Sequence, residues 1–260
     1  MIADRYDAFL FDLDGVLYRG SNAVPGAPQA LGRLRSLEKR IAFVTNNSGR
    51  TPATVAARLR AVGVTADPAE VETSALTTAS LLASRGVASA FVVGEEGIRT
   101  ALTEAGVAVA DSEPERVDAV VVGWDRGADY ASLTTASVLV QRGAALVATN
   151  PDPSFPAADG TRWPGAGALL ALIETTTGVR GEVVGKPNPP LLLAALERAG
   201  GGRPLVIGDR LDTDIAGASA CGWDSLLVLT GISTREDAER GPITPTYVGD
   251  DLAALFNASE

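Results

Sequence analysis

The stretch FLFDLDGVLYRG, residues 9–20, ends an apolar run with two aspartates one residue apart, Asp12 and Asp14, followed by a glycine. Burial excludes unpaired carboxylates, and two carboxylates this close repel each other unless a cation or a shared proton compensates. The stretch therefore predicts a buried strand whose carboxyl end carries a site that needs a compensating partner.

Short apolar runs alternate with segments of helix length along the rest of the chain. This pattern is typical of a parallel sheet with helices on both faces. We therefore expect an α/β fold with a doubly wound parallel-sheet core. The expected strands lie at residues 7–11, 41–45, 89–94, 118–123, 145–149, 181–185, 204–208 and 225–229.

The stretches that carry chemistry are separated by a long middle segment that carries none of them. They lie near residues 9–20, 43–51, 184–190 and 205–217. Because the middle segment has its own expected strands and helices, we interpret it as an inserted α/β domain. The predicted boundaries are 1–82 for the first part of the core, 83–181 for the insertion and 182–260 for the second part of the core.

Composition excludes several classes of function. The formal net charge is −10, and neither Lys nor Arg forms a run, which argues against nucleic acid as a partner. The first residues lack the features of a secretory signal, and no apolar run approaches the ~18 residues of a membrane span, so we expect a cytoplasmic protein without a membrane partner. Histidine is absent, which excludes Ser-His-Asp hydrolysis and His-ligated zinc. Acid-base chemistry must then use carboxylates, Lys, Tyr or Cys.

Polar residues directly follow four of the expected strands. They are Asp12 and Asp14, then Thr45, Asn46 and Asn47, then Lys186, and finally Asp209. In open α/β sheets the ligand crevice lies at the carboxyl ends of the strands, so these residues converge if the four strands are neighbours. Carboxylate oxygens favour Mg²⁺, which also accepts a phosphate oxygen. Lys186 and Thr45 suit the remaining phosphate oxygens.

Four short motifs, DLDGV, TNNS, GKP and GDRLDTDI, occur in this order along the chain. Together they resemble the haloacid dehalogenase superfamily over almost the whole chain, although each one alone is too short to be specific. The insertion resembles the large α/β cap of subfamily IIA, which contains phosphoglycolate, glycerol-3-phosphate, pyridoxal-phosphate and nitrophenyl-phosphate phosphatases. The resemblance implies a phosphatase, because Asp14 stands where dehalogenases lack the second aspartate.

The resemblance also implies a role for each matching residue. Asp12 attacks phosphorus and forms an aspartyl phosphate, and Asp14 protonates the leaving group and then activates water. Asp12, the Asp14 backbone carbonyl and Asp209 would hold Mg²⁺, with Asp214 in a supporting position that orients a metal-bound water or the loop. The residues that would bind phosphate are Thr45, Asn46, Asn47 and Lys186. A purely structural role for Asn47 in its loop stays open.

The segment TNPDPSFP, residues 149–156, provides candidates for substrate specificity. Asn150 and Asp152 lie on a loop stiffened by two prolines, and cap loops lie over the core site in this family. The alternative is a loop packed against the start of the next helix. If Asp152 faces the substrate, its charge disfavours a carboxylate and tolerates a hydroxylated leaving group, which favours polyol phosphates.

The expected partner is a small-molecule phosphate ester, and a homodimer through the cap is the assembly we consider. Two other functions use similar residues. A phospho-acceptor signalling module would be about half as long, lack a cap and not need Asp14. A phosphomutase would keep Asp12 and Asp14 and require a sugar bisphosphate.

Overall fold

The structure is a computed structural model that describes residues 1–110, 112–156 and 161–257. The chain forms two compact units. The first consists of Met1–Thr45, Pro52–Glu72 and Lys186–Glu260, and the second of Asn46–Thr51 and Thr73–Gly185. The predicted insertion at 83–181 falls inside the second unit, and its boundaries stay predictions.

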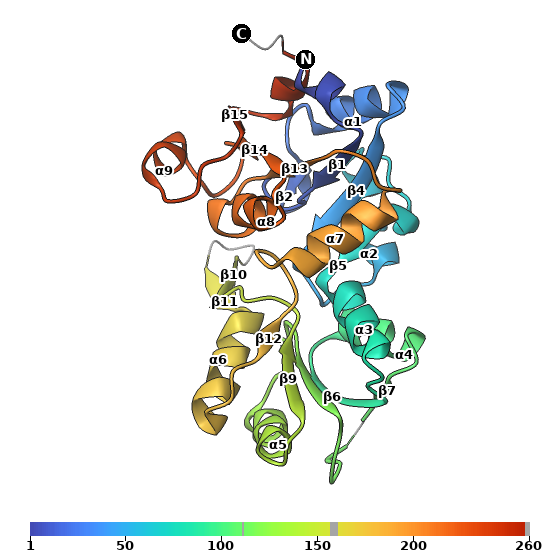
Figure 1. Cartoon of the computed structure of the whole chain (residues 1–260), viewed down its shortest axis with the longest axis vertical. Coiled ribbons are helices and arrows are strands. Elements are labelled where there is room, and N and C mark those ends of the chain that lie inside the picture. The colour runs from blue at the N-terminus through green and yellow to red at the C-terminus, as the bar shows by residue number, and fades with distance from the viewer. Residues whose placement is uncertain (111, 157–160, 258–260) are drawn as a thin grey trace. The chain divides into compact units, whose positions relative to one another are not determined.

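A six-stranded sheet forms the centre of the first unit (Figure 1). Its order is β15-β14-β13-β1-β4-β5, with β1 parallel to both neighbours. The chain passes from β1 outward to β4 and later returns to β13 on the other side of β1, so the strand order reverses between β1 and β13. The strands are β1 (Ala8–Phe11), β4 (Arg40–Thr45), β5 (Val71–Thr73), β13 (Pro204–Gly208), β14 (Asp224–Val228) and β15 (Tyr247–Gly249).

Helices cover both faces of this sheet because side chains of a strand alternate between faces. Phe9 and Phe11 pack on the side of α1 (Ala27–Ser36) and α2 (Pro52–Ala61), whereas Leu10 packs on the side of α7 (Pro189–Arg198) and α8 (Ala216–Ala220). The other elements of the unit are short: η1 (Ile2–Arg5), β2 (Tyr18–Arg19), β3 (Asn22–Ala23), η2 (Pro68–Glu70), η3 (Leu211–Ile215), α9 (Arg235–Arg240) and η4 (Leu252–Phe256).

The second unit has its own five-stranded sheet in the order β12-β9-β8-β6-β7. Its strands are β6 (Ser89–Val93), β7 (Ala108–Val109), β8 (Ala119–Val122), β9 (Ala145–Ala148) and β12 (Glu182–Val183). Helices α3 (Ser74–Ser84) and α4 (Glu96–Glu104) pack on one face, and α5 (Tyr130–Gln141) and α6 (Ala166–Thr177) on the other. A hairpin of β10 (Ser154–Pro156) and β11 (Arg162–Pro164) precedes α6.

The predicted α/β class is confirmed, and each of the eight expected segments contains a strand. The condition that the four strands are neighbours is not met, because the strand before Lys186 does not join the sheet of β1. This strand is β12, which pairs with β9 in the second unit. An apolar run shows that a strand is buried but not which of two sheets contains it. The expectation also missed β5, β7, β15 and the two hairpins, whose strands of two or three residues are too short for an apolar pattern.

Among the described residues, no helix combines the length and the apolar character needed to cross a membrane.

Candidate active site

Three carboxylates meet where the strand order of the first sheet reverses. Asp12 and Asp209 directly follow the neighbouring strands β1 and β13, and Asp214 lies in η3, a π-helical turn that follows Asp209. One oxygen of each carboxylate lies within 4.8 Å of those of the other two. Turns of this uncommon type are often found at functional sites. We call these three residues the Asp12 cluster.

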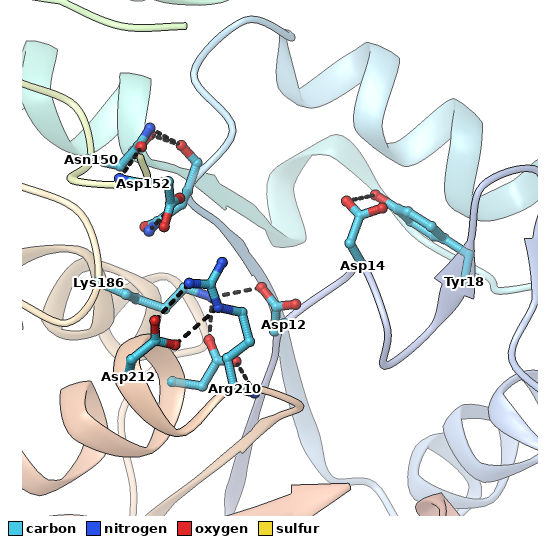
Figure 2. A network of polar contacts seen from close by, with 11 residues as sticks. Asp12, Asp14, Tyr18, Asn150, Asp152, Lys186, Arg210 and Asp212 are labelled. Carbon is cyan, nitrogen blue, oxygen red and sulfur yellow. Dashed lines mark hydrogen bonds and ion pairs between the residues drawn. The ribbon is translucent and has the colours of Figure 1, made fainter. Parts of the chain in front are cut away.

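Lys186 lies against this cluster, although its preceding strand belongs to the other sheet. Its ammonium group donates to Asp12 Oδ1 at 2.6 Å, as Figure 2 shows, and forms an ion pair with Asp214 Oδ1 at 2.7 Å. The side chain is 3% exposed. Burial alone would lower the pKa of Lys186, but Asp12 and Asp214 raise it above its ordinary value. Lys186 is therefore a permanent cation.

The carboxylates of the Asp12 cluster outnumber the ammonium group of Lys186. When all three are ionised, they and Lys186 carry two net negative charges. Burial, together with the charges of Asp214 and Asp209, raises the pKa of Asp12 although Lys186 opposes the shift. Burial and the charge of Asp214 raise the pKa of Asp209 to about 7. A divalent cation would balance the charge and lower both pKa values.

The two carboxylate oxygens of Asp209 differ in their partners, and this difference shows whether a metal ion fits the Asp12 cluster. Its Oδ2 accepts a hydrogen bond from the backbone N–H of Ile232 at 2.7 Å. Its Oδ1 is buried and has no hydrogen-bond partner among the described residues. A buried oxygen without a partner is costly, and carboxylate oxygens are the ligands that Mg²⁺ prefers. The Asp12 cluster therefore fits a magnesium ion.

Asp14 lies apart from this charge cluster. Its side chain is 51% exposed and forms an ion pair with Arg58 at 3.8 Å. The Tyr18 hydroxyl donates to Asp14 Oδ2 at 3.3 Å, and Figure 2 shows the two side chains facing each other. Burial and the nearby Asp14 charge raise the pKa of Tyr18, so this phenol stays protonated and can donate. The predicted metal contact of Asp14 is through its backbone carbonyl and stays a prediction.

The four predicted phosphate-binding residues are divided between the two units. Thr45 is the buried last residue of β4 in the first unit, which also holds Lys186. Asn46 and Asn47 belong to the second unit. Asn47 Oδ1 accepts a hydrogen bond from the backbone N–H of Gly49 at 2.9 Å, which is the turn contact expected for the structural alternative.

The two predicted specificity residues lie together in the second unit (Figure 2). Asn46 Nδ2 donates to Asp152 Oδ2 at 3.2 Å. The side chain of Asn150 is buried, and its Nδ2 donates to the backbone carbonyl of Asn46 at 2.7 Å. The loop also packs against the start of α6, where the N–H of Gly167 donates to the carbonyl of Asp152 at 2.9 Å. Packing against the helix was the alternative foreseen for this loop.

Sequence reasoning missed the partners of Asp14 and the two serines that support the loop after β4. Tyr18 is four residues from Asp14, and its place within the opening stretch was a usable signal. Arg58 lies in α2 and carries no such signal. Ser74 Oγ donates to the carbonyl of Asn46 at 2.6 Å, and Thr149 Oγ1 donates to Ser48 Oγ at 3.0 Å.

Comparison with known proteins agrees with this geometry. The sequence profile described as haloacid dehalogenase-like hydrolase matches residues 9–108, and a profile described as HAD-hydrolase-like matches residues 183–255. The chain belongs to the haloacid dehalogenase-like hydrolase family. The resemblance inferred from the four motifs is thus confirmed.

Relatives of this family member match along nearly its whole length. It is 40% identical to an acid sugar phosphatase of Staphylococcus aureus over 95% of this chain and 96% of the relative. A glycerol phosphate phosphatase of Mycobacterium tuberculosis, solved with magnesium and with calcium, superposes with a TM-score of 0.92 at 40% identity, covering 98% of this chain and 77% or 76% of the relative. A 4-nitrophenylphosphatase of Thermotoga maritima has a TM-score of 0.92 at 33% identity with complete coverage of both chains.

Proposed function

We propose that this protein is a magnesium-dependent phosphatase that hydrolyses small phosphate monoesters through an aspartyl phosphate on Asp12. The observation that carries the proposal is the Asp12 cluster with Lys186 at the reversal point of the sheet. The family and the phosphatases named above support hydrolysis of a phosphoric monoester, and the magnesium complex of one relative supports the metal.

Asp12 is the proposed nucleophile. Lys186 binds its Oδ1, which orients the carboxylate and favours the ionised form that attacks phosphorus. Asp12, Asp14 and Asp209 would hold magnesium, with Asp214 supporting the site. When bound, the ion would neutralise charge on the carboxylates and on the phosphoryl group. Lys186 and Thr45 are the proposed phosphate ligands of the first unit, and Asn46 and Asn47 those of the second.

Asp14 is the proposed acid and base. Its exposed carboxylate can exchange protons with water and with a leaving alkoxide. Tyr18 donates to one carboxylate oxygen and Arg58 lies near the other, so both restrict the orientation of the group. Asp14 would protonate the leaving oxygen in the first step. It would then accept a proton from the water that hydrolyses the aspartyl phosphate.

Substrate preference is the finer part of the proposal. We assign it to the second unit as a cap and to the loop that carries Asn150 and Asp152. A carboxylate at position 152 favours a hydroxylated leaving group over an acidic one. The relatives named as acid sugar phosphatase and glycerol phosphate phosphatase support polyol phosphates as substrates. A homodimer through the cap and a cytoplasmic location stay predictions.

One experiment tests the function. Phosphate release is measured over a panel of phosphorylated metabolites with Mg²⁺ and with excess chelator, and Asp12→Asn serves as the control for contaminating phosphatases. We expect repeated turnover only with the native protein and Mg²⁺. Stoichiometric phosphorylation without turnover would instead indicate a signalling module. Phosphate transfer between positions of a sugar phosphate would indicate a mutase.

A further inference from the structure

The chain crosses between the two units beside both proposed phosphate ligands of the first unit. Of its four crossings, the first lies between Thr45 and Asn46 and the last between Gly185 and Lys186. The residue that follows Thr45 and the residue that precedes Lys186 both belong to the second unit. Contacts that fix Asn46 and Gly185 therefore also restrict the main chain of Thr45 and Lys186, because one peptide bond joins each pair.

Asn46 and Gly185 are held by the same small group of residues. The carbonyl of Asn46 accepts hydrogen bonds from Asn150 Nδ2 at 2.7 Å and Ser74 Oγ at 2.6 Å. The N–H of Gly185 donates to the carbonyl of Thr149, the residue before Asn150, at 2.9 Å. We call Asn46, Ser74, Thr149, Asn150 and Gly185 the crossing cluster.

Gly185 is required for the close approach of these segments. A Cβ atom at this position would lie 2.5 Å from the carbonyl oxygen of Thr149 and 2.6 Å from Asn46 Oδ1. It would also lie 3.1 Å from the Cβ of Asn150. Such distances are far below van der Waals contact, so the two crossing points are packed against each other with no room for a side chain.

Asn150 lies at the centre of the crossing cluster, and each polar atom of its side chain has a partner within the unit. Its Nδ2 donates to the carbonyl of Asn46 and to Thr149 Oγ1 at 3.3 Å, and its Oδ1 accepts the N–H of Asp152 at 3.1 Å. The residue is 3% exposed. Both amide hydrogens of Asn150 are thus used inside the unit, so the side chain has no donor for a substrate hydroxyl.

We propose that Asn150 is a positioning residue for phosphate binding and that it acts by fixing the main chain directly after Thr45. The inference rests on the proposed phosphatase function. Asn150 affects binding of the phosphoryl group, which every substrate shares. Other residues, such as Asp152, discriminate between leaving groups. Ser74, the second donor to the same carbonyl, has the same role.

Asn150→Ala tests this role with two substrates and one product. We expect kcat/KM to fall about threefold to tenfold, the size of one net hydrogen bond, by the same factor for glycerol 3-phosphate and nitrophenyl phosphate. The inhibition constant of inorganic phosphate should rise by a similar factor. Ser74→Ala should change the same quantities in the same direction.

Ser137→Ala is the matched control. Ser137 is a buried hydroxyl of the same unit that donates to a carbonyl, that of Leu133 in α5, at 2.8 Å. The control should leave KM and the inhibition constant unchanged.

Two results would overturn the proposal. A loss confined to glycerol 3-phosphate, with unchanged inhibition by phosphate, would mean that Asn150 reads the leaving group. A lower Tm with unchanged KM and inhibition constant would mean that the residue only stabilises the fold. Calorimetric binding of inorganic phosphate with Mg²⁺ needs no turnover. It therefore tests the positioning role separately, whereas absence of activity in the native protein would contradict the proposed function itself.

Discussion

Asp12 experiences opposing effects on its charge. Burial favours the neutral acid, which would be a poor nucleophile, whereas Lys186 favours the carboxylate. Asp12→Asn keeps the shape of the side chain and removes both the nucleophile and the charge. We expect turnover to fall below detection while the circular dichroism spectrum stays native. Residual turnover above about one thousandth of the native rate would point to a different nucleophile.

Asp14 differs from Asp12 because it is half exposed and its partners include Tyr18 and Arg58. Asp14→Asn removes the proton donor but keeps an acceptor for the Tyr18 hydroxyl. Acid catalysis is typically worth about 10² to 10⁴-fold for a poor leaving group. Nitrophenolate leaves without this help, so we expect kcat to fall much more for glycerol 3-phosphate than for nitrophenyl phosphate. Equal losses on the two substrates would exclude leaving-group protonation as the main role of Asp14.

The sequence named residues that the structure brings together, namely Asp12, Asp209 and Lys186, but it did not name the partners of Asp14. Asp12, Lys186 and Asp209 were predicted because each one directly follows an apolar strand, and the ligand crevice of an open α/β sheet lies at the carboxyl ends of its strands. The contact of Arg58 with Asp14 depends on how α2 packs, and no local pattern encodes this. The burial of Asn150 also depends on tertiary contacts, since TNPDPSFP is equally compatible with an exposed loop and a packed one.

At the scale of elements, longer strands were predictable because burial on both faces of a parallel sheet requires continuous apolar runs. The sheet to which β12 belongs was not predictable, since two residues of pairing leave no distinct pattern. The start of α6 shows another such limit. Its glycines occur in a segment of ordinary helical composition, and only the structure shows what lies against them.

Gly167 in the first turn of α6 allows a contact between this helix and the loop before it. A Cβ atom there would lie 2.1 Å from the carbonyl oxygen of Pro151, and that backbone atom cannot move without shifting the loop. We expect Gly167→Ala to destabilise the protein by about 1 to 3 kcal/mol. Thermal unfolding followed by circular dichroism measures the change.

Gly32→Ala is the matched control for this substitution. Gly32 lies in α1, and a Cβ atom there would have nothing within 4 Å. Alanine should stabilise this helix by about 0.5 to 1 kcal/mol, because glycine is the more flexible residue in the unfolded chain. The two substitutions should therefore change Tm in opposite directions. A rise in Tm for both would contradict the close contact at Gly167.

At the scale of the whole molecule, the chain passes between the two units four times. Two of these crossings lie within the TNNS and GKP motifs. These two motifs therefore contain proposed phosphate ligands and also connect the two units. The sequence indicated a chemical role from the residues that follow apolar strands and from the family resemblance. It placed the insertion by the gap between motifs and did not show that the motifs themselves are shared between units.

The whole molecule should also respond to the charge imbalance of the Asp12 cluster. Asp209 has a pKa of about 7 in the folded protein and an ordinary value of 3.8, so the folded state favours its protonated form. The stability that this proton contributes is complete below about pH 4 and is lost as the pH rises through 7. In chelator, Tm should therefore fall between pH 5.5 and pH 8.

A bound divalent cation replaces the proton, so Mg²⁺ should raise Tm more at pH 8 than at pH 5.5. When the free Mg²⁺ concentration is 100 times the dissociation constant, the ion stabilises the folded state by about 2.7 kcal/mol. For a chain of this size that corresponds to a rise in Tm of roughly 5 to 10 °C. Asp209→Asn carries no titrating group at this position, and it should lose both the part of the pH dependence due to Asp209 and most of the gain from Mg²⁺. A gain from Mg²⁺ that is equal at both pH values, or that survives in Asp209→Asn, would show that the ion stabilises the protein somewhere other than the Asp12 cluster.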